Sequence, residues 1–459
     1  MSLTNRRILY ISFILIFFTI TPMVIFYAAG YKFSLSGIKF QKTGTFIFDT
    51  KPQGAKIFIN GEPQQTFFKK YYSQEKSFIK TPAKIKNLLP GEYNLKFELD
   101  GYQPWQKKLF IYPGASTYAE DVYLFKQNLP ILLLPGKINN LLLSPDKNKL
   151  AILTDGQIIL LDLTNEKQIK LSFDSRLPAA ACAWSPSSKK ILFNNSVINI
   201  ENIKDKTDLT EYIKTEINKI KWDIYSDDKL YYQDKKNMNS FILSAKTNKI
   251  ISKGQPLGHG NEYLIKNNYF YSISQTGNST NLNIFKTDYG QPARIINLPY
   301  SANYNFINPA SQLLNLYDRH HQILYLIDPL IDPLSSFYST LRETISNIKR
   351  ADWVNDNKLL YANDFEIWLF DLKNNKKTLL TRISKVINSV LWHPSNNYII
   401  YSTDTAVNTI ELDKREKYNI TEIIKLDKIA FPALNQKGNT LYFYAKIGNQ
   451  EGLYKLKIH

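Results

Sequence analysis

The sequence predicts an all-β protein behind a single N-terminal membrane helix. Three observations lead to this prediction. Residues 8–29 form an apolar run without a charge, residues 44–126 alternate apolar and polar positions over short runs, and a strand–turn–strand unit recurs at a period near 40 residues from residue 138 onward. Short strands and tight turns repeated at this period are typical of a β-propeller.

The apolar run at 8–29 is long enough to cross a bilayer as a helix. Its 22 residues span roughly 33 Å, and the hydrocarbon core is roughly 30 Å thick. A cleaved signal peptide is the competing interpretation, but its apolar core is usually shorter and ends at small residues, whereas the bulky Tyr27 precedes Ala28 and Ala29 here. We therefore expect an uncleaved transmembrane anchor.

The charges that flank this run indicate its direction. Arg6 and Arg7 precede it, and Lys32 follows it. The positive-inside bias favours a cytoplasmic tail at residues 1–7. The sequence thus predicts a single-pass protein of the cytoplasmic (inner) membrane, with its N-terminus in the cytoplasm, a linker at 30–43 and the bulk of the chain extracytoplasmic.

The composition limits the classes of function. Hydrophobic residues make up 44% of the chain, enough for substantial cores, and the single cysteine, Cys182, excludes an intrachain disulfide framework. The net charge of +18 comes mostly from isolated lysines between predicted strands, without the basic stripe or module that nucleic-acid binding needs. These lysines either solvate strand faces or attract anionic lipid head groups and wall polymers.

Residues 44–126 predict a small β-sandwich of about six strands. Asn60-Gly61 is a hairpin signal, because both positions of that turn need positive φ. The half-buried strands include TFIFDT, AKIFING, YNLKFELD and QKKLFIYP.

This segment resembles the PEGA-domain family. The family's Pro-Glu-Gly-Ala appears here as Pro-Gln-Gly-Ala, and the motifs that carry the resemblance are Gly44-Thr45, Pro52-x-Gly54-Ala55, Thr81-Pro82, Leu88-Leu89-Pro90-Gly91-Glu92-Tyr93 and Asp100-Gly101-Tyr102. The resemblance implies an extracytoplasmic binding or spacer module without catalytic residues.

Residues 62–80 are longer than the corresponding link in that family. They interleave aromatic and basic side chains, a mixture that can stack on sugar rings or lie at a lipid head-group surface. The alternative is that the aromatic rings fold back on the sandwich. The candidate contact residues are Phe67, Phe68, Lys69, Lys70, Tyr71, Tyr72 and Lys76.

The repeats at 127–459 predict the propeller. Each copy has an apolar strand, a turn and a second apolar strand, aligned at Leu143, Trp184, Trp222, Leu264, Phe306, Trp353, Trp392 and Phe431. The last copy ends at its third strand, residues 452–458, and residues 129–135 are the expected donor of its fourth. Eight blades are the first choice; seven remain if the copy at Leu264 is false. The strings WSPSSKKILF and LWHPSNNYIIY resemble the TolB-type, WD-like propeller family, which implies architecture but no activity.

Few side chains suit catalysis or metal binding. His320-His321 is the only histidine pair, and on a strand the two would point to opposite faces, so we expect no metal site there. His393 occupies a blade turn where serine occurs in other copies, which indicates a structural role. Phosphate-loop, HExxH and nucleophile-elbow motifs are absent from the sequence, so we expect no cofactor.

These features favour a non-catalytic, membrane-anchored binding or scaffold protein of the bacterial cell envelope, whose propeller presents a face to a protein or glycan partner. Two alternatives stay open. One is an envelope enzyme that acts on polysaccharide or peptidoglycan with acids in the propeller channel. The other is a purely structural element of the surface layer or wall attachment. The oligomeric state is not predicted.

Overall fold

The structure is a computed structural model that describes residues 3–34, 39–65, 78–172, 182–234, 237–243, 249–256, 262–286, 292–307, 312–329, 331 and 337–459. The chain divides into two compact units, which are described separately. The first comprises Met1–Pro130, Thr409–Ile423 and Leu456–His459, and the second comprises Ile131–Asn408 and Ile424–Lys455.

The first unit begins with helix α1 (Leu3–Ala28), which contains Pro22. Within its stretch Asn5–Ala28, the most apolar 18-residue window has a mean hydropathy of 2.4, and none of that window is buried. The structure thus contains, among its described residues, one helix that is long and apolar enough to span a membrane. The expected linker at 30–43 carries two short strands, β1 (Tyr31–Ser34) and β2 (Lys39–Lys42), which pair antiparallel.

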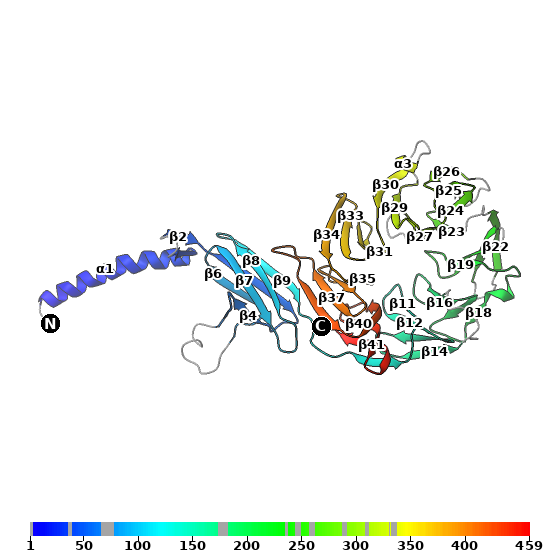
Figure 1. Ribbon diagram of the computed structural model, residues 1–459. Coiled ribbons are helices and arrows are strands. Elements are labelled where there is room, and N and C mark those ends of the chain that lie inside the picture. Colours follow the sequence, from blue (N-terminus) through cyan, green and yellow to red (C-terminus); the bar gives the residue numbers. More distant parts are fainter. Residues whose placement is uncertain are drawn as a thin grey trace. The chain divides into compact units, whose positions relative to one another are not determined.

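The seven strands that follow this pair in the sequence form two sheets (Figure 1). In the three-stranded sheet, β3 pairs antiparallel with β6 and parallel with β9. Its strands, in spatial order, are β6 (Ala83–Leu88), β3 (Gly44–Lys51) and β9 (Ser116–Tyr123). The four-stranded sheet has the order β5 (Glu62–Pro63), β4 (Lys56–Ile59), β7 (Gly91–Glu98) and β8 (Trp105–Ile111).

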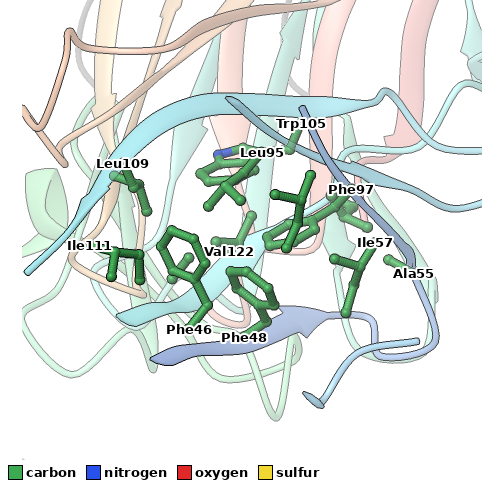
Figure 2. Packing of buried hydrophobic residues seen from close by; sticks show 13 residues of the cluster. Phe46, Phe48, Ala55, Ile57, Leu95, Phe97, Trp105, Leu109, Ile111 and Val122 are labelled. Atoms are coloured by element: carbon green, nitrogen blue, oxygen red, sulfur yellow. The ribbon is translucent and has the colours of Figure 1, made fainter. Parts of the chain in front are cut away.

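A single hydrophobic core lies between these sheets. Burial alternates along β3 and β8 because successive side chains of a strand point to opposite faces. Figure 2 shows Phe46 and Phe48 of β3 facing Leu95 and Phe97 of β7. The expected hairpin at Asn60-Gly61 is confirmed, with φ of 52° and 82° at the two positions.

The second unit is built from four-stranded sheets, which we number as blades 1 to 8 in chain order of their first strands. The sheets of blades 7 and 8 also contain residues of Thr409–Ile423 and Leu456–His459, which belong to the first unit. Blades 1 to 4 consist of β11 (Asn140–Leu143), β12 (Lys149–Thr154), β13 (Gln157–Asp162) and β14 (Gln168–Ser172); β15 (Cys182–Trp184), β16 (Lys190–Phe193), β17 (Ser196–Asn199) and β18 (Lys206–Asp208); β19 (Lys219–Trp222), β20 (Lys229–Gln233), β21 (Asn237–Ile242) and β22 (Lys249–Pro256); and β23 (Glu262–Lys266), β24 (Tyr269–Thr276), β25 (Ser279–Lys286) and β26 (Arg294–Leu298).

Blades 5 to 8 consist of β27 (Tyr304–Ile307), β28 (Leu314–Asp318), β29 (Ile323–Ile327) and β30 (Leu341–Ile345); β31 (Arg350–Asn355), β32 (Lys358–Ala362), β33 (Glu366–Asp371) and β34 (Lys376–Arg382); β35 (Ser389–Trp392), β36 (Tyr398–Ser402), β37 (Ala406–Glu411) and β38 (Ile420–Lys425); and β39 (Lys428–Leu434), β40 (Thr440–Ile447), β41 (Gln450–Lys457) and β10 (Ile131–Pro135). A 3₁₀ turn, η1 (Leu209–Glu211), follows β18, and the short helix α3 (Phe337–Thr340) precedes β30. The copy at Leu264 is a true blade, so eight blades are confirmed.

The ring closes as the sequence predicts. The N-terminal strand β10 pairs antiparallel with the last strand β41, with Ile131 opposite Lys455 and Leu134 opposite Leu453. Blades 8 and 1 also share a hydrophobic cluster, and the Gln436 amide donates to the Lys147 carbonyl at 3.1 Å. Pairing the first and last strands in one sheet removes the edges that an open ring would expose.

The turn between the first two strands of a blade is stabilised by one side chain. Ser144 Oγ accepts from the amide of Lys149 at 2.9 Å, and Ser185 Oγ accepts from the amide of Lys190 at 3.0 Å. His393 stands at the equivalent position of blade 7. Its Nδ1 accepts from the Ser395 amide at 3.2 Å, and its Nε2 lies 3.0 Å from the Gly438 carbonyl of blade 8. These bonds confirm a structural role for His393.

Candidate functional site

The contact loop that the sequence predicts falls outside the described residues. Phe67, Phe68, Lys69, Lys70, Tyr71, Tyr72 and Lys76 all belong to 66–77, of which the structure describes nothing. The two described residues that flank this segment, Gln65 and Phe78, lie side by side and form an isolated bridge. The candidate site described below is therefore built from other residues.

The polar side chains that follow the second strand of each blade lie on one side of the propeller. The first strands of blades 8 and 1, 4 and 5, 6 and 7, and 7 and 8 contact one another, which places the first strands nearest the axis. The start of a first strand lies opposite the end of the second strand, as Asn140 lies opposite Leu153 in blade 1. We call this side, with its turns between second and third strands, the b–c face.

A side-chain pair recurs within single blades on the b–c face. In blade 1, Asn139 donates to Asp155 at 2.7 Å, and in blade 7, Asn388 donates to Asp404 at 2.6 Å. In blade 6, Lys349 forms an ion pair with Asp364 at the same place. Each pair joins the residue before the first strand to the turn after the second strand. The partners are 15 or 16 residues apart, and this spacing is the signal that the sequence analysis missed.

A charged network crosses the first strands of blades 3 to 5 on this face. Glu262 forms ion pairs with Lys219 and with Lys221, the latter at 3.1 Å. Asn305, with its amide oriented to satisfy both partners, donates to Glu262 at 3.0 Å and accepts from Nε of Arg319 at 3.0 Å. Burial lowers the pKa of Lys221, although Glu262 acts in the opposite direction. Glu262 is thus paired directly with two lysines and is linked to Arg319 through the Asn305 amide.

A pocket of about 570 Å³ opens on the b–c face at blades 5 and 6. Lys349 and Asp364 line one part of it, and Glu366 and Arg382 line another. Hydrogen bonds from the indole of Trp368 and the guanidinium of Arg382 hold the pKa of Glu366 below its usual range. Phe365 also lines the pocket, and 46% of its surface is exposed. The pocket therefore combines two ion pairs with one exposed aromatic ring.

The opposite side of the same blades carries a smaller pocket, of about 420 Å³. Arg342 and Asp328 line it as an ion pair at 3.1 Å, together with Asn357 and Leu372. This pocket has no aromatic lining residue among those described, and it provides a natural comparison for the b–c face.

The expectation for His320-His321 is corrected in its geometry. Both residues lie in the turn between β28 and β29, because Asp318 at the end of β28 accepts from their backbone amides at 3.0 and 3.2 Å. His321 Nδ1 also lies 2.6 Å from Asp318 Oδ2, and Ser301 Oγ donates to Oδ1 at 2.7 Å. Burial alone would raise the pKa of Asp318, but these hydrogen bonds lower it.

This cluster is arranged for turn formation and not for nucleophilic catalysis. A base must contact the nucleophile that it activates, whereas Asp318 separates Ser301 from His321. Within the part of the chain that the structure describes, no group of three His, Cys, Asp or Glu side chains is placed to hold a metal ion.

Comparisons with known proteins add a likeness of fold. No protein-family model matches the chain, and no curated protein matches it. Among solved structures, the chain is similar to the Dos1 propeller, with a TM-score of 0.49 and 14% identity over 72% of this chain and 95% of that chain. It is also similar to a chain from a structure of the eukaryotic initiation factor, with a TM-score of 0.46 and 10% identity over 70% and 85% of the two chains. A third similarity is to a chain of the mitotic checkpoint complex, with a TM-score of 0.39 and 10% identity over 70% and 87%.

Proposed function

We propose that the chain is a membrane-anchored, non-catalytic binding protein whose propeller holds a protein partner on its b–c face. The observation that carries this proposal is the pocket at blades 5 and 6, in which exposed Phe365 lies among the ion pairs of Lys349 and Arg382. An exposed aromatic ring and arginine are the side chains most enriched where proteins bind one another.

The charge of the face favours a partner segment that carries carboxylates. Within this network, Lys219, Lys221 and Arg319 outnumber Glu262, and all four belong to the same face as the pocket. Such a positive region speeds the approach of an acidic partner and selects against a basic one. A cell-wall glycan is the alternative ligand, since an exposed phenyl ring can also stack on a sugar.

A photocrosslinking experiment tests this proposal. The photoreactive p-benzoylphenylalanine is incorporated in place of Phe365, or in place of Asn357 in the opposite pocket as the matched control. Illumination of cells that make the full chain is expected to yield a discrete protein adduct from position 365 and none from position 357. Arg382→Ala should weaken that adduct, and Arg342→Ala should not. Equal labelling from both positions, or none from 365, would count against the proposal.

The proposal includes the location that the sequence predicts. Helix α1 anchors the chain in the cytoplasmic membrane of a bacterium, Arg6 and Arg7 stay in the cytoplasm, and the strands that resemble a PEGA domain act as an extracytoplasmic spacer. Protease treatment of intact cells should digest residues 44–459 from outside. Protection of this region until the cells are lysed would place it in the cytoplasm.

The enzyme alternative predicts a different result. Purified full-length protein would then release products from peptidoglycan or polysaccharide fragments, and substitution of acids on the first strands would abolish the release. We expect no product release, because acids of the b–c face are already engaged: Asp155 and Asp364 are paired within their own blades, and Glu262 is paired with Lys221 of the neighbouring blade.

A further inference from the structure

The end of helix α1 carries a group of aromatic rings that pack on one another. Phe26 of the helix stacks on Phe40 of β2, with ring centroids 5.0 Å apart, and lies edge-on to Tyr31 of β1 at 6.0 Å. Phe33 of β1 meets Phe40 at 5.4 Å. These contacts extend the apolar surface of the helix directly onto the β1–β2 pair.

These rings remain partly exposed to solvent although they pack on one another. The exposed fractions of Phe26, Phe33 and Phe40 are 43%, 44% and 49%. They continue the apolar surface of α1, where each side chain from Ile8 to Phe18 is exposed. An aromatic patch continuous with a membrane-spanning helix lies at the level of the membrane–water interface, where Trp and Tyr side chains gather.

Basic side chains occupy the same two strands. Lys32 follows Tyr31, and Lys39 and Lys42 stand at the two ends of β2. The first acidic residue of the sequence is Asp49, so every charged side chain from residue 1 to residue 48 is basic. Long lysine side chains can reach head-group phosphates while their stems lie along apolar surface.

Backbone contacts hold this region at one position on the first unit. The Gly30 carbonyl accepts from both the amide and the hydroxyl of Thr43 at 2.7 Å, and the Thr43 carbonyl accepts from the Gly114 amide at 3.0 Å. Asn87 on the sandwich donates to the Tyr27 hydroxyl at 3.0 Å. The helix end and the β1–β2 pair are therefore part of a folded unit, and the depth of one determines the depth of the other.

We propose that Phe26, Tyr31, Phe33 and Phe40, with Lys32, Lys39 and Lys42, form a collar that sits in the head-group layer and binds anionic phospholipid. The rings occupy the boundary between head groups and acyl chains, and the ammonium groups meet the phosphates. This inference rests on the membrane anchoring included in the proposed function. It goes further by assigning lipid binding to a folded part of the chain that follows the helix.

Fluorescence quenching of an introduced tryptophan tests the depth of the collar. Full-length variants Phe40→Trp, Phe17→Trp and Phe365→Trp are placed in nanodiscs that contain phosphatidylglycerol and lipids brominated both near the head-group end and near the methyl end of the acyl chain. We expect the bromines to quench most of the fluorescence of the tryptophans introduced at positions 17 and 40. The fluorescence of the tryptophan introduced at 365 should be unchanged. Quenching at 17 without quenching at 40 overturns the collar while the membrane span stands. A lack of quenching at both positions overturns the span as well.

The lipid preference is tested with charge variants. The triple variant Lys32→Gln, Lys39→Gln, Lys42→Gln should lose most of the phosphatidylglycerol that the full chain retains in native mass spectrometry. The matched control, Lys84→Gln, Lys86→Gln, Lys108→Gln, removes three exposed lysines of the sandwich and should retain it. Equal retention by the two variants overturns the assignment of these three lysines. If the tryptophan at position 40 is not quenched and a second copy of the chain covers the collar, the collar does not bind lipid.

Discussion

Leu134 and Gly452 lie side by side where the chain closes its propeller. A Cβ atom on Gly452 would overlap the carbonyl oxygen of Leu134 and would lie 3.0 Å from the Cα of Pro135. The pairing of β10 with β41 shifts its register between Leu132 and Leu134, next to this point. The close approach of the two backbones therefore requires a residue without a side chain at position 452.

The first prediction concerns this closure. Gly452→Ala should lower the free energy of unfolding of the propeller by about 1–3 kcal/mol, because the strands must separate to admit the methyl group. Hydrogen exchange of the β41 amides should accelerate accordingly. Lys457→Ala, an exposed position of the same strand, is the control and should change neither quantity. If hydrogen exchange of the β41 amides is unchanged in Gly452→Ala, the close approach of β10 does not stabilise β41.

The second prediction concerns the only cysteine. Cys182 packs against the hydrophobic cluster between blades 1 and 2, and burial raises the pKa of its thiol to about 12. Because the thiolate is the reactive form, alkylation of the native protein at pH 8 should be roughly 1000-fold slower than that of the unfolded protein. Iodoacetamide labelling with and without urea measures this ratio. A native rate close to the unfolded rate would contradict the burial of the thiol.

The third prediction concerns pH. Burial lowers the pKa of His393 to about 4, against an ordinary value of 6.5, although the bond to the Gly438 carbonyl acts in the opposite direction. The folded state therefore favours the neutral ring. Its contribution to stability is complete above pH 6.5 and is lost as the pH falls toward 4, by up to about 3 kcal/mol.

Urea unfolding across this pH range measures the loss. His393→Ser introduces the residue that Ser144 and Ser185 supply in other blades, and it removes the titrating ring. The variant should show a smaller decrease in stability between pH 6.5 and 4 than the wild type. Carboxylates elsewhere titrate in both proteins, so the difference between the two curves isolates His393. Parallel curves would contradict the prediction.

The fourth prediction concerns a buried ion pair of the first unit. Lys107 Nζ lies 3.2 Å from Glu411 Oε2, and the two side chains are 0% and 7% exposed. The Trp105 indole donates to the same oxygen at 3.0 Å. Burial raises the pKa of Glu411, although the Lys107 ammonium lowers it. Lys107→Met should cost about 3–5 kcal/mol, because it leaves a buried carboxylate without its cation.

The double variant Lys107→Met, Glu411→Gln removes both charges and should recover part of that loss. Hydrogen exchange of the β8 amides reports on this unit. Lys56→Met is the control, since its partner Asp100 is almost fully exposed and the pair is expected to contribute at most about 1 kcal/mol. Equal losses for Lys107→Met and Lys56→Met would show that the buried pair is no stronger than a surface pair.

Much of the fold could be predicted because it depends on local periodicity. Alternation at a period of two marks β3 and β8, and an apolar run without charge marks α1. The 40-residue repeat even identified residues 129–135 as the strand that pairs with β41. The weak copy at Leu264 was harder, because its turn is Asn267-Asn268 and lacks the Ser-Pro or Asp signal of blades 1, 2, 3 and 6.

The candidate site was less predictable, because its residues are distant in the sequence. Nothing local in the sequence brings Lys349, Phe365 and Arg382 to one pocket; the antiparallel order within blade 6 does so. His320 and His321 were expected on a strand, yet Asp318 turns the chain there through hydrogen bonds that depend on its burial.

The sequence by itself determined the apolar N-terminal helix, the strand-rich composition and the blade period, since each follows from the order of apolar and polar residues along a short segment. Only the tertiary structure decided which turns share the b–c face, that Gly452 must pass beside Leu134, and that Phe26, Phe33 and Phe40 form one surface. These features depend on which distant segments become neighbours. That choice is made by the packing of whole sheets, which no local pattern specifies.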